Sequence, residues 1–240
     1  MDKLCIDIGN SRIKLALMEE GKVKRYAVHW IKEETAIIKW LEEVEFEKGI
    51  YSSVLAQDPD WLLAFKDKRK LIRLSSNTNL PLKIHYKTPE TLGTDRIAAM
   101  AGALALYKKG ALLVVNAGTC ITYDLVNNHG EFIGGNIAPG LEMRCKAMHD
   151  YTASLPLIKV HDPGNSFIGY DTVSAMENGA LQGIVLEIEG YFVRLRKNYP
   201  ELHVVLSGGN APFLVNHLKI SIFAEPYLVL KGLNTILDYQ

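Results

Sequence analysis

Two segments of this chain, one at the N-terminus and one near the middle, share a pattern that limits the folds available to it. In each segment an apolar strand carries Asp or Asn near its end, Gly follows two residues later, and a second strand returns after a polar turn. The first runs from Leu4 to Leu17, and the second from Ala111 to Val126. Gly with Asn or Thr between apolar strands is typical of a tight hairpin. We therefore expect two similar lobes, each built on one hairpin, with a cleft between the two glycine turns.

The rest of the chain alternates between short strands and amphipathic segments, which predicts an α/β fold. Apolar spacing predicts helices at 33–44, 59–65, 97–107, 171–196, 211–218 and 227–237. Buried strands are expected at 23–30, 50–54, 71–74 and 204–206. Gly110 is the expected C-cap of the alanine-rich helix. We expect an N-terminal lobe over residues 1–110 and a C-terminal lobe over residues 111–240.

Charge and cysteine content argue against several classes of protein. Lysine plus arginine equal aspartate plus glutamate at 27 each, so no overall field favours nucleic acid or an anionic membrane. No apolar run reaches membrane-spanning length, and the N-terminus lacks a signal-peptide pattern. The three cysteines, Cys5, Cys120 and Cys145, form no CxxC pair. A cytoplasmic protein with a small-molecule partner is therefore expected.

The first hairpin turn carries the residue types that hold a metal–phosphate group. No P-loop and no GxGxxG motif occurs, so bound phosphates would be held in another way. Within Asp7–Lys14 a carboxylate suits Mg²⁺, a glycine exposes backbone N–H groups, and a lysine balances charge. An ordinary hairpin explains this turn alone equally well. The second turn, Asn116–Thr122, favours phosphate binding because two such turns can hold one triphosphate.

A third motif, Thr91–Arg96, precedes the alanine-rich helix. The simpler interpretation is that Thr94 or Asp95 caps this helix. In the functional interpretation, Asp95 accepts the proton of a substrate hydroxyl and Arg96 pairs with an anionic group of the substrate. Both interpretations are compatible. The glycines at 134–135 and at 140 either shape a second pocket or form plain turns.

These ordered motifs resemble the type III pantothenate kinases, which share a superfamily with actin, heat-shock ATPases, acetate kinases and sugar kinases. The resemblance spans nearly the whole chain. Its further motif residues are Tyr86 with Pro89, Gly118-Thr119 with Thr122, Gly134-Gly135 with Pro139-Gly140, Leu155-Pro156, and Gly169 with Thr172. It implies two ribonuclease H-like, actin-like lobes with mixed sheets flanked by helices.

The resemblance also implies roles for individual residues. ATP would contact Asp7, Ile8, Gly9, Asn10, Ser11, Arg12, Ile13, Lys14 and Thr119. Asp95 would be the catalytic base. Pantothenate would be surrounded by Tyr86, Gly93, Thr94, Asp95, Arg96 and Thr172. Mg²⁺ would be held near Asp7 through ATP, and a homodimer is expected in which Thr172 of a partner subunit completes the pocket.

One position departs from the family pattern. Asn116 stands where the family usually has Asp at a site for an activating K⁺ or NH₄⁺ ion, and a neutral amide is a weaker cation ligand, which argues against dependence on a monovalent cation. The alternative is a cation held by the side-chain carbonyl oxygen of Asn116 and the nearby Asp124. The expected reaction is ATP-dependent phosphorylation of pantothenate to 4'-phosphopantothenate, the first step of coenzyme A biosynthesis. The alternatives are a kinase for another small hydroxyl compound, or a non-catalytic regulatory relative.

Overall fold

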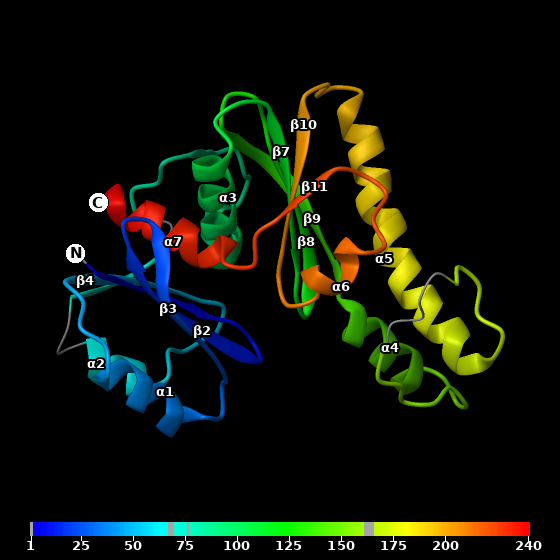
Figure 1. The fold of residues 1–240 in the computed structure, drawn as a ribbon, viewed down its shortest axis with the longest axis horizontal. Coiled ribbons are helices and arrows are strands. Elements are labelled where there is room, and N and C mark those ends of the chain that lie inside the picture. Colours follow the sequence, from blue (N-terminus) through cyan, green and yellow to red (C-terminus); the bar gives the residue numbers. More distant parts are fainter. Residues whose placement is uncertain (1, 67–69, 76, 161–165) are drawn as a thin grey trace. The chain divides into compact units, whose positions relative to one another are not determined.

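The computed structural model describes residues 2–66, 70–75, 77–160 and 166–240. It divides into two compact units (Figure 1). Unit 1 comprises residues 1–108, 130–133 and 227–240, and unit 2 comprises residues 109–129 and 134–226. The packing thus groups the last helix with unit 1, although its position in the sequence lies after the boundary expected near residue 110.

Unit 1 is built on a five-stranded sheet with the order β3-β2-β1-β4-β5. Its strands are β1 Lys3–Ile8, β2 Arg12–Glu19, β3 Lys22–Trp30, β4 Lys48–Ser53 and β5 Leu71–Arg73. Its helices are α1 Glu34–Glu42, α2 Asp60–Lys66, α3 Thr94–Leu106 and α7 Leu228–Asp238, with a 3₁₀ turn, η1, at Pro89–Thr91. The expected opening of three strands before the first helix is confirmed.

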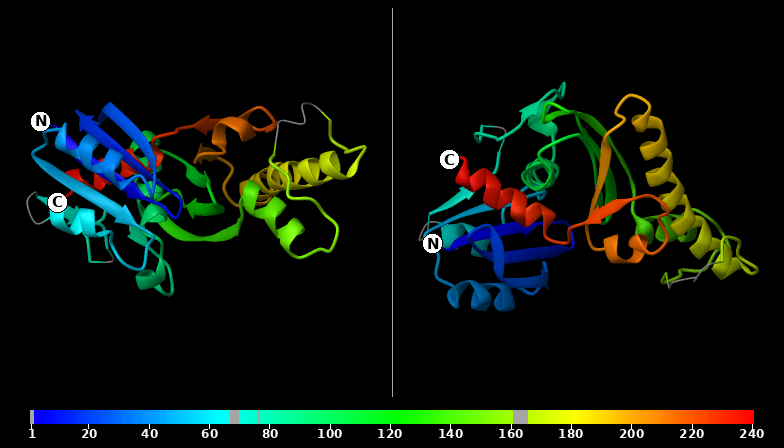
Figure 2. Two further views of the ribbon diagram at one scale, coloured as in Figure 1. Left: turned by 90° about the horizontal axis from the view of Figure 1, so that it is seen from below. Right: turned by 45° about the horizontal axis from the view of Figure 1, so that its top comes forward.

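The core of unit 1 lies on both faces of its central strand. Leu4, Ile6 and Ile8 of β1 are buried with Ile37 and Trp40 of α1. The opposite face is covered by α7, which also packs against α3 (Figure 2). Strands buried on both faces read as continuous apolar runs, which explains the β1 sequence.

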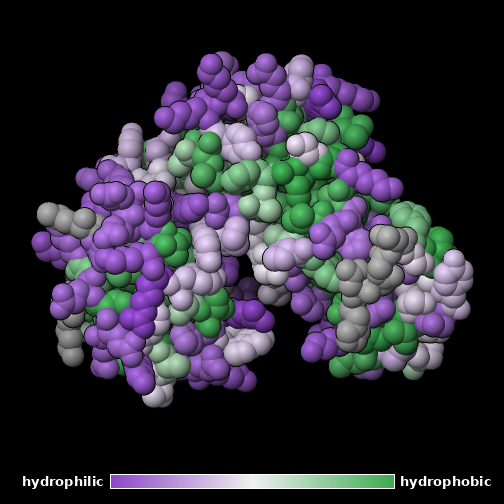
Figure 3. Space-filling model, viewed as in Figure 1, coloured by the Kyte–Doolittle hydropathy of each residue, from purple (hydrophilic) through white to green (hydrophobic). Residues whose placement is uncertain are grey.

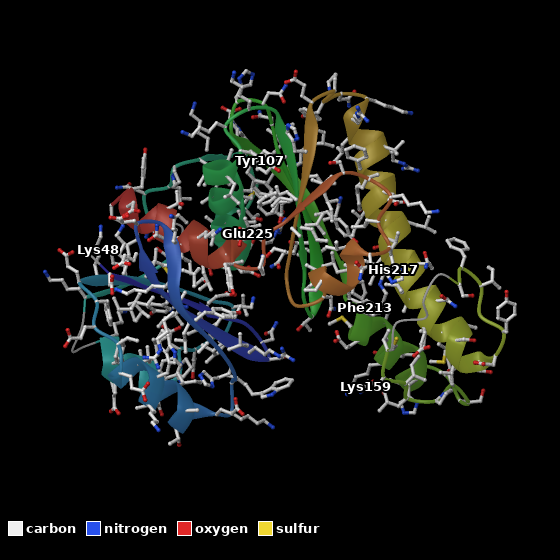
Figure 4. All side chains as sticks on the ribbon, in the orientation of Figure 1. Lys48, Tyr107, Lys159, Phe213, His217 and Glu225 are labelled. Carbon is white, nitrogen blue, oxygen red and sulfur yellow. The ribbon has the colours of Figure 1, made fainter. Side chains whose placement is uncertain are left out.

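The α3 and α7 helices approach each other at glycines. A Cβ atom added to Gly232 of α7 would lie 1.7 Å from the Ala98 carbonyl oxygen of α3. One added to Gly102 of α3 would lie 2.4 Å from the Leu228 carbonyl oxygen. Lys48 of β4 is labelled in Figure 4, and its Nζ donates to the Leu237 carbonyl 3.2 Å away in α7. The C-terminal helix is therefore an integral part of unit 1.

Unit 2 repeats the same arrangement of its first strands. β7 Ala111–Ala117 pairs antiparallel with β8 Cys120–Val126 and parallel with β10 Leu202–Ser207, just as β1 pairs with β2 and with β4. The strand order of this six-stranded sheet is β11-β10-β7-β8-β9-β6, with β9 at Glu131–Pro139 and β11 at Ile222–Ala224; its last strand, β6 at Lys83–Ile84, comes from the chain segment of unit 1. The repeat predicted from the two hairpin segments is confirmed.

Helices α4 Leu141–Asp150, α5 Thr172–Arg196 and α6 Ala211–Val215 belong to unit 2. They share a core with β7, in which Leu113 and Val115 are buried with Leu181 and Ile184 of α5. Asp171 caps α5 by accepting a hydrogen bond from the Ser174 N–H, as part of a capping box. The prediction of one long helix over 171–196 is confirmed.

Some expectations about local structure were wrong. The alanine-rich helix ends at Leu106 and Tyr107 is its C-cap, in an extended conformation, so Gly110 lies beyond the helix end. Gly110 has a φ of 82° and an added Cβ would lie 2.5 Å from the Glu201 carbonyl oxygen, which explains a glycine there. The glycines at 134 and 135 lie within β9 and are not turns.

Candidate active site

Asp7 lies at the end of β1, where the sheet of unit 1 places a donor on each side of its carboxylate. It pairs with Lys14 across the antiparallel β1–β2 ladder and with Ser52 across the parallel β1–β4 ladder. The Lys14 Nζ lies 3.1 Å from Asp7 Oδ2, and the Ser52 hydroxyl donates to Asp7 Oδ1 at 3.1 Å. Asp7 is only 6% exposed, so this carboxylate is fixed in place by its neighbours.

Lys14 is held in its charged form. Burial disfavours its ammonium group, but the charge of Asp7 and the hydrogen bond to it outweigh that effect, so the pKa of Lys14 is raised above its ordinary value. The negative charge of Asp95 acts in the same direction. Lys14 is therefore positively charged at neutral pH, and the carboxylates of Asp7 and Asp95 both favour this charge.

The turn between β1 and β2 leaves polar groups exposed and apolar ones buried. The Gly9 N–H donates to the Arg12 carbonyl at 3.0 Å, and Asn10, Ser11 and Arg12 are exposed. The side chains of Ile8 and Ile13, predicted among the ATP contacts, are fully buried in the core. At Ile8 and Ile13, therefore, only backbone atoms are available to contact a ligand.

Asp95 occupies the first turn of α3, whose N-cap is Gly93. Its Oδ1 accepts from the Arg96 N–H at 2.9 Å, while neither Thr94 nor Asp95 serves as the N-cap residue, contrary to the simpler interpretation of the sequence. A Cβ atom on Gly93 would lie 2.6 Å from Asp95 Oδ1, so glycine makes room for the carboxylate. Thr94 donates from Oγ1 to the Ser53 carbonyl at 3.4 Å, which links the start of α3 to the end of β4.

Arg96 is buried and lies against two aromatic rings of unit 1. Its guanidinium carbon is 5.7 Å from the ring centroid of Tyr86 and 5.7 Å from that of Phe132, and these rings stack 5.6 Å apart. Phe132 reaches unit 1 through β6 (Lys83–Ile84), because Ile84 lies opposite Phe132 in a parallel pair. Such contacts orient a guanidinium that is otherwise flexible.

The second hairpin lies in unit 2. Asn116 of β7 lies opposite Thr122 of β8 and Ser207 of β10, the positions that correspond to Lys14 and Ser52 in unit 1. The Gly118 N–H donates to the Cys120 carbonyl at 3.0 Å, and Thr119 at the tip of the turn is exposed. The Thr122 hydroxyl is buried without a hydrogen-bond partner. Thr172 is the first residue of α5 and is exposed.

The structure thus brings most of the predicted site residues together within one unit. Unit 1 contains Asp7, Ile8, Gly9, Asn10, Ser11, Arg12, Ile13, Lys14, Tyr86, Gly93, Thr94, Asp95 and Arg96. Unit 2 contains Asn116, Thr119 and Thr172. Sequence reasoning missed Ser52 and Phe132, which contact site residues from β4 and β9. A polar residue in the buried β4 segment was the available signal for Ser52, whereas nothing in the sequence pointed to Phe132.

The described side chains do not by themselves form a metal cage. Within the described residues, no three His, Cys, Asp or Glu side chains lie close enough together to hold a metal ion. A single buried carboxylate such as Asp7 nevertheless suits Mg²⁺, which typically takes one or two protein carboxylates and completes its shell with phosphate oxygens and water.

Among the described helices, none is long and apolar enough to cross a membrane.

The sequence of the chain is similar to that of known proteins. The family model described as type III pantothenate kinase matches residues 3–194. A type III pantothenate kinase of Bacteroides fragilis is 41% identical over 244 residues, covering 99% of this chain and 98% of the relative.

Solved structures show the same fold. A Campylobacter jejuni protein assigned to the Baf family of transcriptional activators has a TM-score of 0.66 at 23% identity, covering 98% of each chain. A Sinorhizobium meliloti protein assigned as a 2-dehydro-3-deoxygalactonokinase has a TM-score of 0.62 at 12% identity, covering 99% of this chain and 97% of the other. The predicted fold class, with its two actin-like lobes and mixed sheets flanked by helices, is thereby confirmed.

Proposed function

The chain belongs to the type III pantothenate kinase family, and from this premise we propose that it transfers the γ-phosphoryl group of ATP to the primary hydroxyl of pantothenate. The products are ADP and 4'-phosphopantothenate, at the start of coenzyme A biosynthesis. The observation that carries the proposal is the placement of the Asp95 carboxylate in the same unit as the Asp7–Lys14 pair, with the charges of both carboxylates acting on the Lys14 ammonium group. A phosphoryl-transfer site needs this combination of a carboxylate base, a metal-binding carboxylate and a cation.

In this proposal Asp95 serves as the base. As the hydroxyl oxygen bonds to the γ-phosphorus and the bond from that phosphorus to the β–γ bridging oxygen breaks, the hydroxyl proton passes to Asp95. Lys14 balances negative charge near the phosphates, and the exposed turn after Gly9 offers backbone N–H groups to them. Mg²⁺, when bound with ATP near Asp7, neutralises phosphate charge.

Arg96 provides the positive charge for the carboxylate of pantothenate. Its stacking against Tyr86 and Phe132 keeps the guanidinium in one orientation, which favours paired hydrogen bonds to a carboxylate. Thr119 in unit 2 is proposed to contact ATP, and Thr172 to contact pantothenate. Gly93 and Thr94 contribute by shaping the start of α3 beside Asp95.

The proposal includes a homodimer in the cytoplasm. In support of a dimer, α5 leaves large apolar side chains in solvent, and Leu186 and Val193 are 53% and 58% exposed two turns apart. Hydrophobic surface shows on the side of unit 2 that carries α5 in Figure 3. In support of a reducing compartment, all three cysteines are free and two are buried. Light scattering on the natural chain and on Leu186→Glu tests the dimer.

The decisive experiment is a coupled assay of ADP release with purified protein, ATP, Mg²⁺ and pantothenate, followed by Asp95→Asn. Asp95→Asn should fold normally and lose about 10²- to 10⁴-fold in kcat, the range for a general base. The matched control is Asp60→Asn, because Asp60 also begins a helix of unit 1 but is exposed at α2. Near-full activity of Asp95→Asn would refute the base. A panel of other alcohols separates pantothenate from a different acceptor.

A further inference from the structure

Ser52 is a buried polar residue to which neither the family motifs nor the proposed reaction assigns a task. It lies in β4, is fully buried, and has buried neighbours at Ile50 and Tyr51. A hydroxyl group in such a strand costs free energy unless it is hydrogen-bonded. The Ser52 hydroxyl donates a hydrogen bond to Oδ1 of Asp7, 3.1 Å away. The hydroxyl is therefore satisfied by a carboxylate of the candidate active site.

The two donors to Asp7 come from opposite sides. Ser52 approaches Oδ1 from β4, and Lys14 approaches Oδ2 from β2. Because each oxygen has one donor, rotation of the carboxylate about the Cβ–Cγ bond of Asp7 would break both interactions at once. A carboxylate has about four lone-pair sites, so two donors leave acceptor capacity for a cation or its water ligands. Ser52 and Lys14 thus fix the plane of the Asp7 carboxylate and leave some of its lone pairs free to bind a cation.

The end of β4 also holds the start of α3. The carbonyl group of Ser53, the next residue, accepts the hydrogen bond from Thr94, which directly precedes Asp95. The end of β4 therefore contacts Asp7 through one residue and the helix of Asp95 through the next. A shift of this strand end would move both carboxylates of the proposed reaction.

We propose that Ser52 is a positioning residue that orients the Asp7 carboxylate for a divalent cation bound to nucleotide phosphates. The inference rests on the proposed function for its nucleotide and cation, but not on pantothenate as the acceptor. Partners behind a metal-binding group typically contribute 10- to 100-fold to metal affinity, by fixing the orientation of that group. The competing explanation is that Ser52 only satisfies a buried hydroxyl and stabilises the sheet.

Two variants and a matched control separate these explanations. Ser52→Ala removes the hydroxyl, and Ser52→Cys keeps similar volume with a weaker donor. Tyr51→Phe is the control, because Tyr51 is the preceding buried residue of β4 and its hydroxyl also donates to a carboxylate, that of Asp58 at 2.6 Å. Each change removes or weakens one hydroxyl–carboxylate bond of β4, but only the Ser52 changes touch Asp7.

The readout is binding of ADP as a function of Mg²⁺ concentration by calorimetry, together with thermal unfolding. We expect Ser52→Ala to raise the Mg²⁺ concentration at half-maximal ADP binding about tenfold, and Ser52→Cys to raise it less. Tyr51→Phe should lower the melting temperature and leave the Mg²⁺ midpoint unchanged. The KM for pantothenate should stay within about twofold in all three, because none contacts Arg96.

An unchanged Mg²⁺ midpoint in folded Ser52→Ala overturns the inference, as does a wild-type protein that binds ADP equally with and without Mg²⁺. If neither Ser52 variant folds, the hydroxyl is a requirement of the fold and the positioning role is also overturned. Wild-type protein that binds Mg²⁺ and ADP but leaves pantothenate unphosphorylated refutes the proposed function alone. The binding measurement then still decides the role of Ser52.

Discussion

The two hairpins of this protein have the same topology but are held in place by different forces. In unit 1, Asp7 is fixed by side chains, through the ion pair with Lys14 and the hydrogen bond from Ser52. In unit 2, the corresponding Asn116 carries no charge, and the turn after it is held by backbone contacts. A Cβ atom on Gly140 would lie 2.2 Å from the Gly118 carbonyl oxygen, and one on Gly208 would lie 2.3 Å from that of Ala117. The Gly140 N–H also donates to the Thr119 carbonyl at 3.0 Å.

This difference shows that a repeated fold can divide its tasks between copies. The charged hairpin is suited to bind a metal–phosphate group through fixed side chains. The neutral hairpin offers a rigid backbone, whose N–H groups need no side-chain charge to contact phosphate. Changes that exchange the chemistry of the two hairpins therefore test the comparison directly.

The largest loss of activity is expected when the carboxylate of the first hairpin is replaced by the amide that the second hairpin carries at the corresponding position. Asp7→Asn should lower kcat/KM by about 10²- to 10³-fold, the usual cost of removing one well-placed electrostatic group. The coupled kinase assay measures the loss, with Asp2→Asn as the control because its ion pair with Lys24 is partly exposed. Equal activity of Asp7→Asn and the natural chain would remove the charged hairpin from the mechanism.

The second prediction addresses the backbone contacts of the second hairpin. Gly140→Ala should lower the free energy of unfolding by about 2–3 kcal/mol, because backbone atoms must shift to admit the methyl group. Gly9→Ala should cost less, since its Cβ atom meets only the Arg12 carbonyl oxygen at 3.2 Å. Gly179→Ala in α5 is the control and should stabilise slightly, because nothing lies within 4 Å. Urea unfolding ranks the three, and the reverse order would contradict the comparison.

The third prediction concerns pH. Because the folded pKa of Lys14 is raised, its contribution to stability is fully present below the pKa of the unfolded lysine and is lost as pH rises through the folded pKa. The difference in unfolding free energy between the natural chain and Lys14→Met should therefore be constant near neutral pH and shrink above about pH 10.5. Denaturant unfolding at about pH 8 and at higher pH measures it. A difference that grows with pH would contradict the assigned ion pair.

The smallest effect is expected from monovalent cations. The natural chain should give rates within about twofold in K⁺ and in K⁺-free buffer, because the neutral amide of Asn116 is a weak cation ligand. Asn116→Asp should gain a response to K⁺, which Asn128→Asp, at an exposed turn, should not. A strict K⁺ requirement of the natural chain would show that the second hairpin binds cations without a carboxylate at this position.

Local patterns in the sequence predicted much of this structure. Both hairpins, the helix over 171–196 and the helix beginning near Gly93 follow from apolar spacing and turn residues that lie close together in the chain. Strand β9 was missed because its two glycines resemble a turn, and α4 was missed because only Leu141 and Cys145 of its ten residues are buried. Both β9 and α4 are stabilised by packing against segments that lie far away in the sequence. The spacing of apolar residues within one segment does not reveal such packing.

The residues of the candidate site also fall into two groups, those predicted from local motifs and those that were missed. Asp7, Lys14 and Asp95 were predicted as site residues because each lies in a short motif with a turn or a helix start. Ser52 and Phe132 were not found, because the first reaches Asp7 across a parallel strand pair 45 residues away in sequence and the second reaches Tyr86 through the β6–β9 pair. Contacts between distant segments need a known strand register, which the sequence alone does not supply.

The glycine contacts between α3 and α7 have a consequence for how the molecule is made. The helix that carries Asp95 is translated well before residue 227, yet its packing partner follows about 120 residues after α3 ends. At typical rates of protein synthesis this delay is on the order of ten seconds. During that interval the side of α3 that α7 covers in the folded protein has no partner, so the nascent chain exposes this apolar surface until α7 leaves the ribosome.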